Sequence, residues 1–295
     1  MIEIKLSQGA KPGHGGVLPG AKVTKEIAEA RGIPVGQTCA SPPSHSAFST
    51  PIEMMEFVAK LRELSGGKPV GLKFCVGNRW EVLAMCKAML ETGIRADFMV
   101  VDGGEGGTGA APAEFLDHVG APLRQGLVLT RNALVGTGLK DDVKLACSGK
   151  QLSAFSLASS MALGADWVNT ARGFMFSLGC IQSLNCHNNT CPTGIATSNA
   201  SLQRGLVVPD KSERVYHFHK NTVAALMEVV GAAGVEHPSE LTPRHIMHRV
   251  TADIAKPASR AYELLKPGVL LEEAEQTHLA TEWAMAQTSS FSSVI

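Results

Sequence analysis

The feature that most constrains the fold is an alternation of short apolar runs with helical patterns, which continues from the first residues to about residue 205. Nearly continuous apolar runs, as in the last four of five candidate strands, are typical of strands buried on both faces of a parallel sheet. Helical windows separate them, so the repeat is of the βα type. The sequence predicts strands over residues 2–6, 70–76, 97–101, 143–147 and 167–170, and helices over residues 52–64, 80–91 and 155–163.

The number of strands is smaller than a closed barrel needs. A (β/α)8 barrel has eight βα units in about 250 residues, whereas five strands are predicted in the first 170 residues of this chain. Residues 35–40 could form a sixth strand, but the Ser-Pro-Pro-Ser that follows is more typical of a loop.

The pattern changes to helix alone after Gly205. Residues 211–230 carry apolar side chains at helical spacing, and residues 243–250 and 272–285 give shorter helical signals. We therefore expect two parts, an α/β domain over residues 1–205 and a helical C-terminal extension over residues 206–295.

The charge balance excludes several partners. Lys+Arg 27 against Asp+Glu 27 gives a formal net charge of +0, so there is no basic surface for nucleic acid or for an anionic membrane. The N-terminus lacks the features of a secretion signal, and no run of about 18 apolar residues could span a bilayer. We expect a cytoplasmic protein that binds neither nucleic acid nor membrane.

Three of the seven cysteines are clustered: Cys180, Cys186 and Cys191 lie within twelve residues. Thiolates this close in sequence suit an iron-sulfur cluster or zinc. Zinc normally takes four ligands and would have to recruit His187, whereas a 3Fe-4S cluster needs only three thiolates. Three buried free cysteines are the remaining alternative.

A glycine-rich segment, Gly-Glu-Gly-Gly-Thr-Gly at residues 104–109, follows a predicted strand and satisfies the pattern G-x-G-x-x-G. A Rossmann unit would continue directly into a helix, but Ala-Ala-Pro intervenes, and the expected acidic residue at the end of the next strand is absent. A loop at the mouth of a barrel, where a flat ligand can approach backbone amides, explains the glycines better than a dinucleotide site. A flexible turn is the other interpretation.

Two further strand ends and one strand interior carry candidate ligand contacts. The loops after consecutive strands of a barrel commonly bind phosphate through backbone amides, although each turn taken singly is ordinary. A lysine within an otherwise apolar strand needs an anionic partner unless it reaches water, so Lys73 could hold a flavin carbonyl or a substrate carboxylate. The predicted phosphate-binding residues are Ser148, Gly149, Lys150, Ala171, Arg172 and Gly173.

Together these motifs resemble the FMN-binding synthase domain of glutamate synthases, and most closely the stand-alone proteins of the FMN-binding glutamate synthase family. The resemblance runs in order through residues 8–16 (Gln-Gly-Ala-Lys-Pro-Gly-His-Gly-Gly), residues 41–45 (Ser-Pro-Pro-Ser-His), the Lys73 strand, residues 106–110 (Gly-Gly-Thr-Gly-Ala) and the cysteine segment with its Cys-Pro-Thr-Gly. It covers nearly the whole chain, and the cysteine segment is its most specific part.

The resemblance implies a (β/α)8 TIM-barrel type of fold that is incomplete. It places Met1 just before the fourth strand of the barrel, so that only strands 4 to 8 are present. We expect an open five-stranded parallel sheet with helices on its outer face and the would-be barrel interior exposed. A missing N-terminal segment, or a second copy of the chain, would then be a partner.

The resemblance also implies an activity and its cofactors. It implies FMN and a 3Fe-4S cluster, with 2-oxoglutarate and ammonia condensing to an imine that accepts a hydride from reduced FMN. No glutaminase domain and no nicotinamide site are recognisable, so a ferredoxin or a separate reductase subunit would supply electrons. The implied catalytic residues are Lys73, Glu105 and His14, the implied flavin loop includes Gly106, Gly107 and Thr108, and the implied cluster ligands are Cys180, Cys186 and Cys191.

Three departures from the family pattern keep alternatives open. His14 stands where the family has a glutamate that meets the incoming ammonia, and Glu105 stands where it has an aspartate. The phosphate loop reads Ser-Gly-Lys at residues 148–150, where the family usually has Asp-Gly-Gly. Histidine cannot supply the same fixed negative charge. The alternatives are a related flavin and iron-sulfur oxidoreductase that uses another amine or amino acid, of the N-methylglutamate synthase type, and a non-catalytic metal-binding barrel fragment.

The cysteine assignment can be tested by one substitution. Changing Cys186 to serine should remove the cluster, because three thiolates are already the minimum for a 3Fe-4S centre. Iron and acid-labile sulfide assays should show loss of both in Cys186→Ser. Retention at the wild-type stoichiometry would contradict the assignment.

Overall fold

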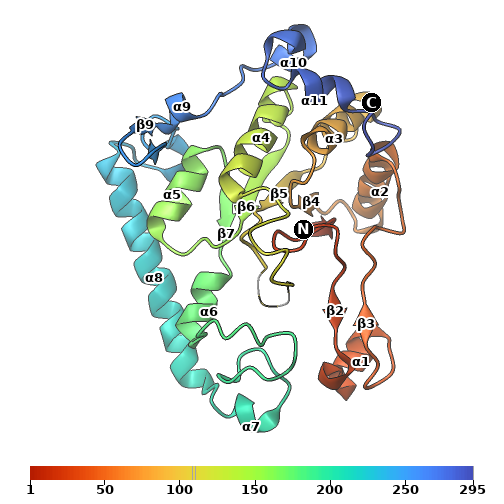
Figure 1. The fold of residues 1–295 in the computed structure, drawn as a ribbon, viewed down its shortest axis with the longest axis vertical. Helices are drawn as coiled ribbons and strands as arrows, with labels where there is room; N and C mark the ends of the chain where they lie inside the picture. The colour runs from red at the N-terminus through yellow and green to blue at the C-terminus, as the bar shows by residue number, and fades with distance from the viewer. Residues whose placement is uncertain (108, 110, 295) are drawn as a thin grey trace.

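The fold is built on one open parallel sheet (Figure 1). The structure is a computed structural model and describes residues 1–107, 109 and 111–294. All neighbouring strands pair in parallel, and the sheet does not close on itself within the described residues. The strands are, in spatial order, β1 (Ile2–Lys5), β4 (Val70–Phe74), β5 (Phe98–Asp102), β6 (Lys144–Ser148) and β7 (Trp167–Asn169). The five predicted strands are thus confirmed, with ends that differ by one or two residues.

The strand order follows the chain order without reversal. A doubly wound sheet reverses its order at a switch point, whereas a (β/α)8 barrel adds each strand beside the preceding one. The order β1-β4-β5-β6-β7 is therefore that of five successive barrel strands. This confirms an α/β fold of the barrel type that is incomplete.

The helices between the strands begin at recognisable caps. Thr50 and Glu53 form a capping box at the start of α2, and Asn78 and Glu81 do the same for α3. The helices are α1 (Lys25–Arg31), α2 (Pro51–Leu64), α3 (Arg79–Thr92), α4 (Leu123–Gly136), α5 (Ala154–Ala162), α6 (Arg172–Leu178), α7 (Ala200–Gln203), α8 (Val208–Ala232), α9 (Ala258–Ala261), α10 (Val269–Glu272) and α11 (Ala280–Met285), with 3-10 turns η1 (Gly20–Lys22), η3 (Pro238–Glu240) and η4 (Ala274–Gln276).

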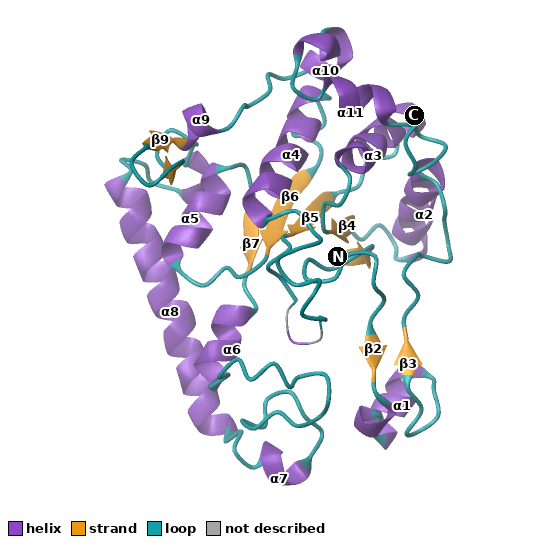
Figure 2. Ribbon diagram, in the orientation of Figure 1, coloured by secondary structure: helices purple, strands orange, loops and turns teal. Residues whose placement is uncertain are grey.

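The sheet has two different faces. Leu72, Met99 and Leu145 point to the layer of helices and belong to the main core with residues of α2, α3, α4 and α5. Because side chains alternate along a strand, their neighbours point the other way. The opposite face, which we call the open face because the helices of the βα units lie on the other side, carries a small separate cluster of Phe98, Val100 and Ala146 with Trp167 packed against it. These three side chains are almost fully buried, so the expectation of an exposed barrel interior is wrong for the middle of β5 and β6. Helices thus cover the outer face, as expected, and Figure 2 shows loops in front of the carboxyl ends of the strands.

The C-terminal part packs on the same core. Val230 of α8 and Leu270 of α10 are fully buried in the main core cluster, and α8 lies along α5 and α6 (Figure 1). Lys87 of α3 donates hydrogen bonds to the carbonyls of Trp283 and Ala286, at 2.7 and 2.9 Å. The boundary at residue 205 stays a prediction.

Two sequence predictions near the ends of the chain are wrong or only partly right. Residues 243–250 do not form a helix, because β8 (Met247–Arg249) pairs antiparallel with β9 (Ala255–Pro257). The range 272–285 is helical only in short pieces. Residues 35–40 add no strand to the main sheet: β3 (Cys39–Ala40) pairs instead with β2 (Val17–Leu18).

No described residue belongs to a helix long and apolar enough to cross a membrane.

The helix-facing side of the sheet should carry much of the stability. Leu145 is fully buried, whereas Leu64 at the end of α2 is 73% exposed. Leu145→Ala should lower the free energy of unfolding by about 2–5 kcal/mol because it leaves a cavity, and Leu64→Ala should change it by less than about 0.5 kcal/mol. Urea denaturation of both variants measures the difference. Equal effects would contradict the assignment of faces.

Candidate functional site

The centre of the candidate site is Asp102, a buried carboxylate at the carboxyl end of β5. Its Oδ1 accepts a hydrogen bond from the Ser148 hydroxyl at 2.7 Å, and its Oδ2 accepts one from the Gly9 amide at 2.9 Å. The Lys73 ammonium lies 3.8 Å from Oδ2. Asp102 therefore joins the ends of β1, β4, β5 and β6.

Lys73 points to the same face of the sheet as Asp102. The partner anticipated for this lysine was a ligand anion, but the structure supplies Asp102. The Lys73 side chain keeps 22% of its surface exposed, whereas the Asp102 side chain keeps 5%. The Lys73 ammonium can thus contact a ligand on the open face, while the buried Asp102 carboxylate balances its charge.

Glycines let the loops approach one another around Asp102. A Cβ on Gly9 would lie 1.6 Å from the Gly103 carbonyl oxygen, and a Cβ on Gly106 would lie 2.4 Å from Oδ1 of Asp102. The Ala10 amide donates to the Gly106 carbonyl at 2.5 Å, and Gln8 Nε2 donates to the Gly107 carbonyl at 3.0 Å. The loop of residues 104–107 is packed against the loop after β1. Thr108, which was predicted to contact the flavin, lies outside the described residues.

Glu105 and His14, two of the predicted catalytic residues, contact neighbouring protein groups. The Glu105 carboxylate accepts hydrogen bonds from the Leu123 amide at 3.2 and 2.9 Å, so it caps the first turn of α4. His14 is exposed and contacts Phe115 edge to face, with ring centroids 5.4 Å apart. Its Nδ1 lies 2.8 Å from the Gly15 carbonyl oxygen. Their catalytic roles stay predictions.

The two predicted phosphate loops, residues 148–150 and 171–173, have different surroundings. In the first, the Ser148 hydroxyl donates a hydrogen bond to Asp102, and Lys150 forms an exposed ion pair with Asp117 at 3.0 Å. Gly149 adopts a φ of 124°, which other residues rarely adopt. Ala171 precedes α6, and Arg172 is its first residue. Gly173 is buried where a Cβ would lie 2.6 Å from the Phe218 ring of α8, so close helix packing explains this glycine.

The three clustered cysteines lie on the loop between α6 and α7, which we call the cysteine segment (residues 180–199). Burial raises the pKa of the Cys186 thiol, and the neighbouring thiols of Cys191 and Cys180 raise it further, whereas Arg172 and Lys22 oppose the shift. The three thiols are thus close enough to interact electrostatically. Within the described residues, however, no three His, Cys, Asp or Glu side chains converge closely enough to hold a metal ion.

Cys191 has the most thiolate-like surroundings of the three. Burial by itself would raise its pKa, but hydrogen bonds from the Thr193 hydroxyl and from the amides of Ala196, Thr193 and Ile195 outweigh burial and lower the pKa to about 7. Hydrogen bonds to sulfur of this kind also surround iron-sulfur ligands. These surroundings suit a thiolate ligand of a soft metal centre, and His187, which zinc would need as a fourth ligand, is exposed.

The glycine-rich loop reaches the cysteine segment. A Cβ on Gly109 would lie 2.6 Å from the Cys186 sulfur. The loop next to Asp102 and the cysteine segment are therefore in direct contact.

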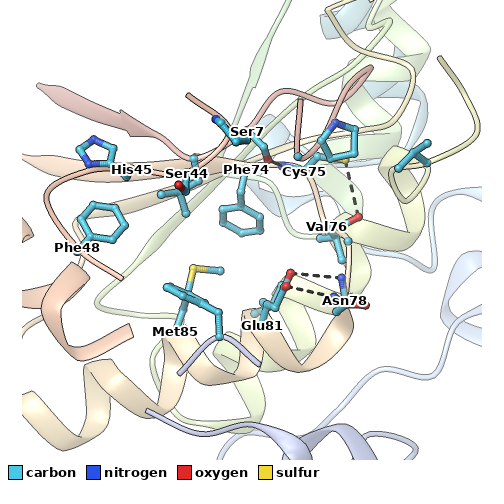
Figure 3. A pocket seen from close by; sticks show the side chains of 18 of the residues that line it. Ser7, Ser44, His45, Phe48, Phe74, Cys75, Val76, Asn78, Glu81 and Met85 are labelled. Atoms are coloured by element: carbon cyan, nitrogen blue, oxygen red, sulfur yellow. Dashed lines mark hydrogen bonds between the residues drawn. The ribbon is translucent and has the colours of Figure 1, made fainter. Parts of the chain in front are cut away.

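A separate cleft of about 670 Å³ lies beside this face, between the ends of β1 and β4 and helix α3 (Figure 3). His45 stacks on Phe48 at one side of it, with ring centroids 4.5 Å apart, and Asn78 donates to Glu81 at the other. None of the predicted site residues lines this cleft. The cleft and the Asp102 centre are neighbouring but different places.

Most of the chain matches a known protein family. Residues 1–236 match the family described as the conserved region in glutamate synthase. The chain belongs to this family. It is 42% identical over 248 residues to the glutamate synthase large subunit-like protein YerD of Bacillus subtilis (strain 168), covering 84% of this chain and 47% of that protein.

Other similar proteins are also glutamate synthases by name. The archaeal glutamate synthase (NADPH) of Methanocaldococcus jannaschii is 36% identical over 235 residues, covering 79% of this chain and 45% of that protein. The chain thus spans about half the length of these relatives. Among solved structures, a flavocytochrome b2 variant with sulfite bound gives a TM-score of 0.46 at 13% identity, covering 92% of this chain and 51% of that one.

Asp102 should matter more for stability than an exposed aspartate in a similar ion pair. Asp102→Ala removes the acceptor for Ser148 and Gly9, so the free energy of unfolding should fall by about 2–3 kcal/mol. Asp117→Asn removes the charge of the exposed pair with Lys150 and keeps a residue type that tolerates the left-handed backbone there (φ 64°), so it should cost less than about 1 kcal/mol. Urea denaturation compares the two variants. A cost for Asp102→Ala as small as that of Asp117→Asn would contradict the central place given to Asp102.

Proposed function

We propose that this chain is the flavin-binding part of a glutamate synthase-type oxidoreductase, which reductively aminates 2-oxoglutarate to glutamate with FMN and a 3Fe-4S cluster. The observation that carries the proposal is the Lys73–Asp102–Ser148 group on the open face of the sheet, where Lys73 stays partly exposed, in a chain of this family. The carboxyl ends of barrel strands are where such enzymes place their sites. We propose a cytoplasmic location.

The residues of the open face suit a flat anionic cofactor. The backbone of residues 104–107 and the Lys73 ammonium would lie against the flavin, while Ser148, Gly149, Lys150 and Arg172 would hold its phosphate. When bound, FMN supplies the hydride. Lys73 also offers a cation for a carboxylate of 2-oxoglutarate, and Asp102 holds that cation in place from behind.

The cysteine segment suits the electron-carrying cluster. Cys180, Cys186 and Cys191 would be its three ligands, and the bound cluster passes electrons toward the flavin. The contact between Gly109 and Cys186 supports the proposal, because it joins the two sites without an intervening layer of protein. A ferredoxin or a separate reductase subunit would supply the electrons. A segment N-terminal to this one, or a second copy of the chain, would cover the open face.

His14 favours a second candidate for the amine. It is an exposed imidazole beside Phe115, and it offers no fixed negative charge to an ammonium ion. A primary amine such as methylamine could pack its carbon on these rings. The second candidate is therefore a related enzyme that forms N-methylglutamate.

The proposed reaction can be tested with chemically reduced protein. Anaerobic incubation with 2-oxoglutarate and either ammonium or methylamine should give glutamate or N-methylglutamate, measured by mass spectrometry. Lys73→Met should lower kcat/KM for 2-oxoglutarate by about 100-fold, or about 2.7 kcal/mol. Lys60→Met, on the exposed side of α2, is the matched control and should leave it unchanged.

The outcomes separate the candidates. Glutamate alone supports the first, and N-methylglutamate alone supports the second. Absence of both products from protein that holds FMN and iron would contradict both and favour a non-catalytic metal-binding fragment.

A further inference from the structure

A second segment of the chain lies against the cysteine segment. Residues 17–40, which we call the arm, contain the β2–β3 pair, η1 and α1, and they project from the sheet (Figure 1). The arm is separated from the cysteine segment by about 150 positions in the sequence, yet η1 carries a side chain that reaches it.

That side chain is Lys22. Its ammonium donates a hydrogen bond to the Cys186 carbonyl and a second one, at 3.0 Å, to the Ala196 carbonyl. Both contacts are partly buried. The two carbonyls lie on either side of Cys191 in the sequence, so one cation braces both ends of the stretch that holds two of the three thiols.

Hydrogen bonds within the cysteine segment also hold this stretch together. Asn189 Oδ1 accepts hydrogen bonds from the Thr197 hydroxyl at 3.0 Å and from the Ser198 amide at 2.8 Å. These bonds fix the shape of the turn but not its position relative to the rest of the molecule. Lys22 supplies a connection to the arm, which places the turn.

The same contact places a positive charge next to a proposed cluster ligand, because the ammonium is bonded to the carbonyl of Cys186 itself and the contact is partly buried. A fixed positive charge beside a redox centre favours the reduced state, because reduction adds negative charge. A neutral hydrogen-bond donor would not supply that charge.

We propose that Lys22 is a positioning residue for the iron-sulfur site: it fixes the cysteine segment to the arm through two carbonyls and raises the reduction potential of the cluster. The inference rests on the proposed function for the cluster itself. The contact between the arm and the cysteine segment, however, is a property of the protein without iron and can be measured separately.

The first measurement is hydrogen exchange on the full chain without iron. In Lys22→Met, amides of residues 186–197 should exchange at least tenfold faster than in the wild-type protein. Lys22→Arg, which keeps the charge and the donors, should restore slow exchange. Lys25→Met, an exposed lysine of α1, is the matched control and should exchange like the wild type. Wild-type exchange in Lys22→Met would overturn the positioning role.

The second measurement is a potentiometric titration of anaerobically reconstituted protein followed by electron paramagnetic resonance. Lys22→Met should lower the equilibrium constant for cluster reduction about tenfold, or 59 mV for one electron, while Lys22→Arg stays near the wild type. Loss of iron from Lys22→Met alone, restored in Lys22→Arg, would equally support the proposal. An unchanged potential in fully loaded Lys22→Met would overturn the electrostatic role.

A wild-type protein that takes up no iron would contradict the cluster assignment, while the exchange experiment would still decide whether Lys22 holds the cysteine segment.

Discussion

The carboxylate of Asp102 is the interaction on which the site depends. It receives the Ser148 hydroxyl and the Gly9 amide and balances the Lys73 ammonium, so it joins four strand ends that are far apart in the sequence. Burial of a carboxylate is costly unless every oxygen is satisfied. The glycines at positions 9 and 106 leave the room that this arrangement needs. The same charge balance leaves the Lys73 ammonium partly exposed, so that it is available to the proposed ligand.

The strand order explains why the helices of the βα units lie on one side of the sheet. Each βα unit adds its strand beside the preceding one and its helix to the same side, so the helices cover one face and the opposite face is left to ligands and loops. Gly109 of the glycine-rich segment meets Cys186 of the cysteine segment. The proposed flavin and cluster sites therefore meet at this contact, and Lys22 of the arm holds the cysteine segment through the carbonyls of Cys186 and Ala196.

The sequence predicted the five strands, because buried parallel strands are nearly uniform apolar runs, and it predicted the helices with clear caps. It did not predict α4, whose Gly126 and Gly136 are unfavourable in a helix by themselves and are explained by the side chains of other elements that pack against them. It placed a helix at residues 243–250 where a hairpin forms. Asp102 was missed because its importance comes from partners distant in sequence, although a carboxylate directly after the apolar run at residues 98–101 was a visible signal. Whether Glu105 acts on substrate or only caps α4 depends likewise on tertiary contacts.

The central claim is that the open face holds a flavin and the neighbouring cysteine segment an iron-sulfur cluster. The most direct test is the visible absorption spectrum of the purified full chain after anaerobic reconstitution, with metal analysis of the same sample. The account predicts flavin bands together with a broad iron-sulfur absorption that bleaches on reduction. A colourless protein that contains zinc, or no cofactor at all, would contradict it.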